Sequence, residues 1–183
     1  MIVNVRKASR ADRQAVVDVI VAAFGDAEGR GIAELVTCLL EDPSAQPLLS
    51  LVATVNERVV GYVLYTKVRV EDSMRTVSAS LLAPLAVRPE FQNSGIGGQL
   101  IKDGLKQLEK AGVDLVFVLG HPGYYPKYGF SPAGIRGLKV PYPMAPENSD
   151  AWMVQEIRPG VLGRVSGTVA CADVLNDPKY WIE

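Results

Sequence analysis

Two stretches near the start of the chain repeat apolar residues with the period of an amphipathic helix. The apolar positions are spaced by three and four residues, and such a stripe has to be buried against another layer of the fold. Ser9 and Asp12 offer an N-terminal capping pair for the first helix, and Gly25 can end it. The second helix is predicted to stop near Asp42 because Pro43 cannot continue it. The two stripes consist of Val16, Val19, Ile20, Ala23 and Phe24, and of Ile32, Leu35, Val36, Leu39 and Leu40.

Segments rich in β-branched and apolar residues predict the strands of a sheet. Residues 2–7 alternate as a short strand, and residues 48–55 and 59–70 predict an antiparallel hairpin around a turn at 56–58. Residues 71–76 are polar and predict a loop. A central sheet therefore begins in this part of the chain.

A strand, a helix and a second strand follow in close succession. Residues 77–87 predict a strand in which Pro84 removes a ladder donor and indicates a bulge. Residues 96–110 have the pattern of an amphipathic helix, and residues 113–119 form an almost uninterrupted apolar strand. This order indicates a crossover connection between two parallel strands.

Signals after residue 120 are weaker. Residues 124–128 predict at most a short helical turn, and residues 134–147 are dense in proline and glycine and predict a loop. Two late strands are predicted at 152–157 and 164–170.

Length and composition indicate one globular domain. The chain has 183 residues, 48% of them hydrophobic, so we expect residues 1–183 to form a single domain with a core at about 1–130 and a C-terminal extension at 131–183. The formal net charge is −1, which provides no positive field for nucleic acid or an anionic membrane. We therefore expect neither partner.

Cysteine and histidine are scarce. Cys38 and Cys171 are the only cysteines and are expected to be buried free thiols, and His121 is the only histidine. This inventory argues against a multi-histidine metal site, so we expect no metal. Apolar runs are too short for a membrane helix, and the chain starts without a leader pattern, so the expected location is the cytoplasm.

The turn between the strand at 77–87 and the helix at 96–110 is rich in glycine. Gly95, Gly97 and Gly98 lack Cβ atoms and would let an anion approach the first amides of the helix. Those amides are free donors at the positive end of the helix dipole, which suits a phosphate or pyrophosphate. Arg88 is expected to add attraction nearby.

Two common phosphate motifs do not fit this turn. A nucleotide triphosphate P-loop needs Gly-Lys followed by Ser or Thr, which the chain lacks. A dinucleotide fold needs a third glycine where the chain has Leu100, and an acid at the end of the next strand, whereas Asp114 lies at its beginning. A dinucleotide oxidoreductase is therefore a weak alternative.

Two linked motifs stand out, Q-N-S-G-I-G at residues 92–97 and Y-P-K-Y-G-F at residues 125–130. They resemble the acyl-CoA pyrophosphate motif and the Y-x-x-x-G-F feature of the GNAT superfamily of N-acetyltransferases. The order of elements up to about residue 130 is similar too. The segment L-G-H-P-G-Y-Y-P-K-Y-G-F looks closest to a subset of predicted N-acetyltransferases with an extended C-terminal piece.

The resemblance implies an α/β fold whose mixed sheet is splayed between two parallel strands, with helices on both faces. The gap would hold the pantetheine arm of acetyl-CoA, paired with the main chain of Leu85, Ala86 and Val87. Tyr125 would be the general acid that protonates the departing thiolate, with Tyr124 and Tyr128 less favoured. The residues implied around the pyrophosphate are Gln92, Asn93, Ser94, Gly95, Ile96, Gly97 and Gly98.

The chain departs from the family pattern in two places. It has L-G-H-P-G-Y-Y where many members have an Asn several positions before the Tyr, and the strand at 77–87 carries no carboxylate to act as a base. Water is the default proton acceptor, with Glu71 and Asp72 as distant candidates. His121 is a candidate contact to cofactor or substrate, and the loop at 140–146 with Trp152 is a candidate wall of an acceptor pocket.

The resulting hypothesis is an acetyl-CoA-dependent N-acetyltransferase acting on an amine of a small molecule or protein by direct attack in a ternary complex. The alternative is a non-catalytic acyl-CoA-binding sensor that has lost transfer. A homodimer through the N-terminal helices or an edge strand stays open.

Overall fold

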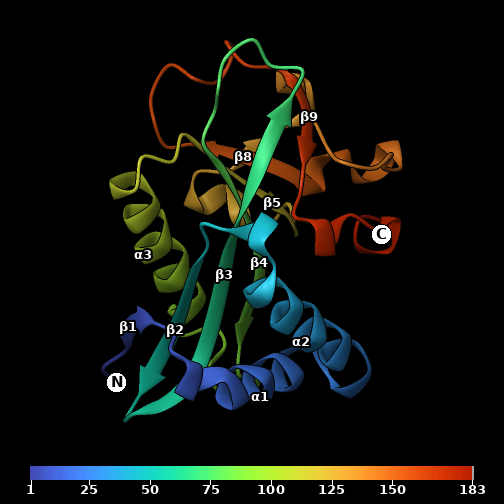
Figure 1. Ribbon diagram of the computed structural model, residues 1–183. Helices are drawn as coiled ribbons and strands as arrows, with labels where there is room; N and C mark the ends of the chain where they lie inside the picture. The colour runs from blue at the N-terminus through green and yellow to red at the C-terminus, as the bar shows by residue number, and fades with distance from the viewer. Residues whose placement is uncertain (183) are drawn as a thin grey trace.

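The computed structural model describes residues 1–182 and shows a mixed sheet with helices on both faces (Figure 1). Seven strands lie in the order β1-β2-β3-β4-β5-β8-β6, and β9 pairs with β3 and β7. The β4–β5 and β7–β9 pairs are parallel and the other strand pairs are antiparallel. The expected α/β class is confirmed. The strands are β1 Asn4–Lys7, β2 Leu49–Val55, β3 Arg58–Glu71, β4 Ala79–Val87, β5 Leu115–Leu119, β6 Ser131–Pro132, β7 Leu138–Lys139, β8 Trp152–Glu156 and β9 Gly167–Ala170.

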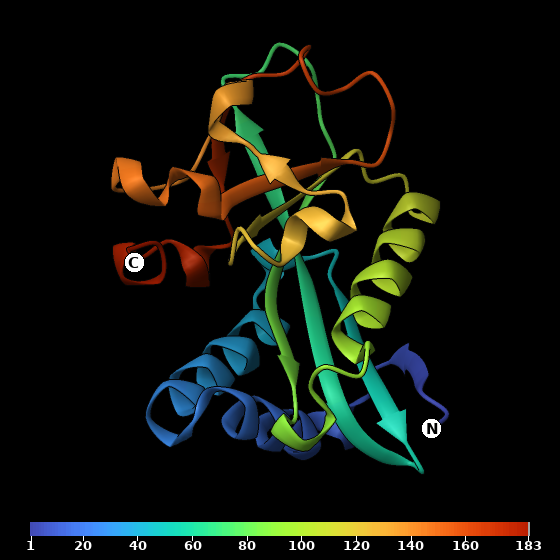
Figure 2. The same cartoon turned by 180° about the vertical axis from the view of Figure 1, so that it is seen from behind.

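Three α-helices cover the sheet. Helices α1 (Arg13–Phe24) and α2 (Asp26–Glu41) lie on one face, and α3 (Ile96–Lys110) lies on the other (Figure 2). Strand β3 alternates between the two resulting cores, because Tyr62 packs with the α1 and α2 stripes and Tyr65 packs with α3. Within residues 1–182, no helix is both long enough and apolar enough to cross a membrane.

The predicted capping pair starts the helical layer. The Ser9 amide donates to Asp12 Oδ2 at 2.7 Å, and the Arg6 guanidinium bonds both oxygens of the same carboxylate at 2.7 and 2.8 Å. These bonds favour the ionised carboxylate and hold the pKa of Asp12 well below its usual range. A short 3-10 turn, Arg10–Asp12, precedes α1, so the regular helix begins later than the cap.

The hairpin between β2 and β3 is tighter than predicted. Asn56 and Glu57 both adopt positive φ, 49° and 66°, which gives a two-residue turn, so Arg58 already belongs to β3. Asparagine tolerates this conformation better than most residues, and the twist of such a turn matches the flanking strands.

The C-terminal extension completes the sheet and returns to α2. Strand β8 pairs with β5 over its whole length, and β9 pairs with the distal end of β3. The segment after β9 is fixed to the end of α2, because the amides of Asp173 and Val174 donate to Ser44 Oγ at 2.8 Å and Asp42 Oδ2 at 3.1 Å. Trp181 packs edge-on against Trp152, with ring centroids 5.9 Å apart.

Two local expectations were wrong. Cys171 is buried, but Cys38 is exposed, because it lies at the edge of the α2 stripe beside a cavity. The segment predicted as loop at 134–147 contains β7, which forms because Leu138 is buried and pairs with Gly167 of β9. Residues 138–139 have no strand-like sequence pattern, whereas β9 lies within the strand predicted at 164–170, so only the tertiary contact reveals β7.

Candidate active site

The parallel strands β4 and β5 separate partway along their length. They pair from Ala79 with Leu115 to Leu82 with Val118, and no further. The register with β3 shifts at the same point, where β4 carries one extra residue around the cis Ala83–Pro84 bond. Beyond this bulge β4 stays paired with β3, while β5 ends against β8. The predicted bulge at Pro84 therefore marks the start of a gap between the parallel strands.

The ladder geometry decides which main-chain groups face the gap. Residues of an antiparallel strand turn their N–H and C=O groups alternately to opposite sides. The Arg88 amide donates to Val60 O at 2.9 Å, so Arg88 and Ala86 face β3, whereas Leu85 and Val87 face the gap. Val87 O accepts from Gln92 Nε2 at 3.0 Å. Leu85 therefore offers both main-chain groups and Val87 its N–H, while Ala86, which is buried, contributes packing.

The turn after β4 forms a cradle of unpaired amides. Asn93 and Gly95 adopt positive φ, 59° and 87°, and Ser94 Oγ donates to Phe91 O, which closes the turn. The Gln99 amide is the first to bond within α3, at 3.0 Å to Gly95 O. Within residues 1–182 the amides of residues 96–98 have no partner, and no side chain caps this helix. These free N–H groups lie at the N-terminus of α3, where the helix dipole is positive, and this arrangement suits an anion.

A cavity of about 500 Å³ lies over this cradle and is called the smaller cavity below. Of the residues expected to bind the cofactor, Ala86 and Ser94 do not line it. Its lining is Leu85, Val87, Phe91, Gln92, Asn93, Gly95, Ile96, Gly97, Gly98, Tyr124, Lys127 and Tyr128.

Two glycines of the motif make room for aromatic rings as well as for an anion. A Cβ atom on Gly97 would lie 2.6 Å from Tyr124 Oη, and one on Gly98 would lie 2.6 Å from Tyr128 Oη. Of the three motif glycines, only Gly95 combines a positive φ with open space around a Cβ atom. The two tyrosines thus dock against the first turn of α3, and burial, with the adjacent Tyr128 hydroxyl, raises the pKa of Tyr124 well above its usual range. Both motifs therefore meet in space.

The positive side chain at the smaller cavity is Lys127, which sequence reasoning missed. Its ammonium lies 4.5 Å from the ring centroid of Tyr124 and 5.9 Å from that of Tyr128. Arg88 was expected to supply this charge, but its Nε donates to Val59 O at 3.3 Å and it does not line the cavity. The signal for Lys127 was its position inside the second motif, between the two tyrosines.

Tyr125 follows β5, which ends at Leu119, and begins the 3-10 turn Tyr125–Tyr128. Its ring covers Gly120, where a Cβ atom would lie 2.4 Å from Tyr125 Cε2. It also packs edge-on against Tyr124 and Phe130, with centroids 5.1 and 5.8 Å apart. Burial raises the pKa of Tyr125 to about 12, so the phenol stays protonated at neutral pH.

A second cavity, of about 850 Å³, is called the larger cavity below. It runs from the gap, at Leu82, Leu85 and Tyr125, to α2 and the C-terminal segment. The two cavities share Leu85 and Tyr124, so they meet at the gap.

His121 also lines the larger cavity, but its hydrogen bonding excludes a role as a base through Nδ1. The Gly123 amide donates to Nδ1 at 3.1 Å, which occupies that lone pair. In the neutral ring the proton is therefore on Nε2, and His121 offers a donor.

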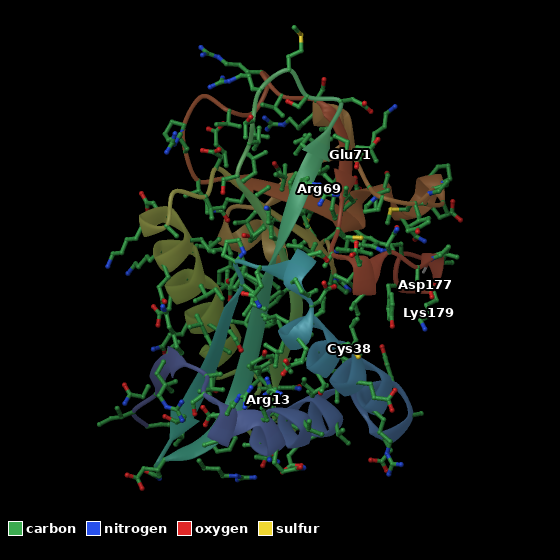
Figure 3. All side chains as sticks on the ribbon, viewed as in Figure 1. Arg13, Cys38, Arg69, Glu71, Asp177 and Lys179 are labelled. Atoms are coloured by element: carbon green, nitrogen blue, oxygen red, sulfur yellow. The ribbon has the colours of Figure 1, made fainter. Side chains whose placement is uncertain are left out.

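The other expected residues lie elsewhere. Glu71 is at the far end of β3, 3.9 Å from Arg69, and Figure 3 shows this pair well away from Cys38 of α2. Trp152 is a core residue stacked on Phe117, with centroids 5.1 Å apart, and with the 140–146 loop it lines a separate cavity of about 460 Å³. The acids that do line the larger cavity are Glu28 and Glu34 of α2. Across residues 1–182, no cluster of three or more His, Cys, Asp or Glu side chains is placed to hold a metal.

Comparisons with known proteins agree with this geometry. The family model described as an acetyltransferase (GNAT) domain matches residues 4–133. The uncharacterized N-acetyltransferase YjhQ of Escherichia coli is 41% identical over 165 residues, which cover 90% of this chain and 89% of that protein. The uncharacterized N-acetyltransferase YhbS of the same species is 34% identical over 123 residues, 66% of this chain and 70% of that protein.

Two solved structures share the whole fold. The crystal structure of YhbS from Escherichia coli in complex with CoA has a TM-score of 0.84 and 28% identity, covering 96% of this chain and 92% of that one. A GNAT family acetyltransferase from Brucella melitensis in complex with acetyl-CoA has a TM-score of 0.74 and 27% identity, covering 95% and 98%. With a splayed parallel pair, a motif-matched amide cradle and this family match over more than half of its length, the chain belongs to the GNAT family of acetyltransferases.

Proposed function

We propose that this protein transfers the acetyl group of acetyl-CoA to a primary amine by direct attack in a ternary complex. The observation that carries the proposal is the meeting of the two cavities at Leu85 and Tyr124. A co-substrate with its pyrophosphate on the cradle can run along the gap and reach the larger cavity beside Tyr125. The complexes of YhbS with CoA and of the Brucella melitensis protein with acetyl-CoA support this mode of binding.

Binding would rest mainly on the backbone. The amides of residues 96–98 would bind the pyrophosphate within the turn built by Gln92, Asn93, Ser94 and Gly95, and Lys127 would add a positive charge. The pantetheine arm would pair with the gap-facing groups of Leu85 and Val87. We also propose that the C-terminal extension belongs to the same domain, because β8 pairs with β5.

Chemistry would follow from holding both reactants together. The amine nitrogen forms a bond to the thioester carbon, the carbon–sulfur bond breaks, and the amine loses one proton to water. The sulfur leaves as a thiolate that accepts a hydrogen bond from the Tyr125 hydroxyl, and it then takes one proton from water. The phenol has a pKa of about 12, above the value of about 8.5 for an ordinary thiol, so its main contribution is a hydrogen bond to the forming thiolate.

The test is release of free thiol from acetyl-CoA with a panel of amines, together with mass spectrometry of the N-acetylated product. Tight binding of acetyl-CoA without transfer to any amine would instead favour a sensor.

Cys38 provides a sharp check of direct attack, because this exposed thiol lines the larger cavity and is the available nucleophile for a two-step route through an acetyl-enzyme. Double-reciprocal plots of the initial rate against acetyl-CoA, at several fixed amine concentrations, should give intersecting lines. The variant Cys38→Ser should keep the wild-type rate. Parallel lines together with an inactive Cys38→Ser variant would contradict a ternary complex.

A further inference from the structure

The outer part of the larger cavity lies between two walls from distant parts of the chain. One wall is the face of α2 that carries Ile32 and Leu35, and the other is the C-terminal segment, residues 171–182. Figure 3 shows Cys38 of α2 below Asp177 and Lys179 of that segment. Because this part continues from the gap, any amine that attacks a thioester beside Tyr125 would place the rest of its structure between the two walls.

The C-terminal wall is held in place before any ligand binds. Val174 is fixed by its amide to Asp42, and the Trp181 indole donates to Leu175 O at 2.8 Å while its ring packs against Trp152. A preformed wall favours binding because little ordering is needed.

Apolar side chains dominate both walls and stay partly open to water. Ile32, Leu35, Val174 and Tyr180 are half-buried, and Ile182 is 67% exposed. Single exposed apolar residues are common on proteins, but here they face one another across a cavity of a size that suits a small ligand. An apolar ligand body would cover them.

The unpaired charges of this cavity are negative. Within residues 1–182, Glu28 and Glu34 form no ion pair or hydrogen bond. The cation on the opposite wall, Lys179, lies 3.7 Å from the Asp177 carboxylate and 5.0 Å from the ring centroid of Tyr180. An ammonium group would therefore be attracted to the cavity, and a carboxylate would be repelled by the two acids.

We infer that the acceptor is a small primary amine on an apolar body without a carboxylate, of the arylalkylamine class, rather than an amino acid or a lysine of a protein. This inference rests on the proposed function, since it concerns the acceptor of the same transfer. The ammonium would be drawn in by Glu28 and Glu34, and the aromatic body would lie between α2 and the C-terminal segment.

The first experiment compares substrates that share a body and differ by a carboxylate. Acetylation of tyramine is measured against tyrosine, and of 2-phenylethylamine against phenylalanine, with ethylamine and a lysine-containing peptide as further arms. The expected kcat/KM of each arylalkylamine is at least about tenfold above that of its amino acid and of ethylamine.

The second experiment removes the two negative charges. The double variant Glu28→Gln with Glu34→Gln should raise the KM for tyramine about fivefold and leave the KM for acetyl-CoA unchanged. Asp26→Asn is the matched control, because Asp26 is an acid of the same helix that does not line the cavity, and it should change neither value.

A third variant tests the apolar wall. The double variant Tyr180→Ala with Ile182→Ala should lower kcat/KM more for tyramine than for ethylamine. The ratio of the two kcat/KM values, tyramine over ethylamine, should fall about tenfold. Ile182 is exposed and Tyr180 is only partly buried against the core, so a melting temperature close to that of the wild type should accompany the loss.

The outcomes separate this inference from the proposed function. If tyrosine or the peptide is acetylated as fast as tyramine, the inference is wrong and the transferase function stands. If the double glutamate variant keeps the wild-type KM for tyramine, recognition of the ammonium by α2 is wrong. If CoA binds and no amine is acetylated, the proposed function fails, and the inference fails with it.

Discussion

The smaller and the larger cavity are built by different means. The smaller cavity is a main-chain site, because unpaired amides of residues 96–98 and the gap-facing groups of Leu85 and Val87 supply its donors. The larger cavity is a side-chain site, formed by α2 and the C-terminal segment around Tyr125. A main-chain site constrains which residues are sterically allowed, whereas a side-chain site can change its preference with each substitution. We infer that the smaller cavity is suited to one invariant co-substrate and that the larger cavity is suited to selecting an acceptor.

The largest expected effect comes from Gly120, the glycine against which the ring of Tyr125 packs. Gly120→Ala would place a Cβ atom 2.4 Å from Tyr125 Cε2, so the ring has to move. A misplacement of about 1 Å can cost about 100-fold in rate, so kcat should fall by about that factor, with the Kd for acetyl-CoA little changed. Steady-state kinetics and calorimetry would measure the two values.

Gly134→Ala is the control for this substitution, because nothing lies within 4 Å of a Cβ atom there and it lies outside both cavities. A Gly120→Ala variant with the wild-type kcat would show that the position of Tyr125 does not matter.

A smaller effect is expected from the one lysine at the cradle. Lys127→Met should weaken acetyl-CoA binding by about tenfold, because most of the positive potential comes from backbone amides that the substitution leaves in place. Titration calorimetry at two salt concentrations would measure it, with Lys106→Met on α3 as the control outside the cavity. A loss of about 1,000-fold would mean that the smaller cavity binds its ligand mainly through side-chain charge and not through backbone amides.

The smallest effect is an expected absence of a change with pH. In the proposed mechanism the protonated phenol of Tyr125 is the active form, and it would be lost only as pH rises through its pKa of about 12. The profile of kcat/KM should therefore rise as the acceptor amine loses its proton and show no decline up to about pH 10.5. A decline centred near pH 10, the ordinary value for tyrosine, would show that burial does not protect this group.

The sequence predicted the residues around the smaller cavity in more detail than those around the larger cavity. Helix α3 has its predicted bounds, and Pro84 lies at the predicted bulge, because an amphipathic period and a missing N–H are local properties. Glycine at 95, 97 and 98 likewise records a steric requirement of the backbone. A motif of this kind can be found in a single sequence.

The larger cavity depends on contacts between residues far apart in the chain. Glu28, Glu34 and Ile182 meet around one cavity only because the segment after β9 returns to α2 through Asp42 and Ser44. No local spacing encodes that return. The sequence also did not predict that Tyr124 packs on Gly97 and Tyr128 on Gly98. These contacts join the glycine-rich turn to the tyrosine-rich motif, which lie far apart in the chain.

The most direct test of the account is the single-turnover rate of acetyl transfer with Tyr125→Phe. Preformed enzyme–acetyl-CoA complex would be mixed with saturating tyramine and the N-acetylated product followed in time. The matched control is Tyr62→Phe, because the Tyr62 hydroxyl bonds Ser50 outside both cavities. We expect a rate about 100-fold below wild type at an unchanged affinity for acetyl-CoA, because the substitution removes only the hydroxyl proposed to bond the leaving sulfur. An unchanged single-turnover rate would contradict the role of Tyr125.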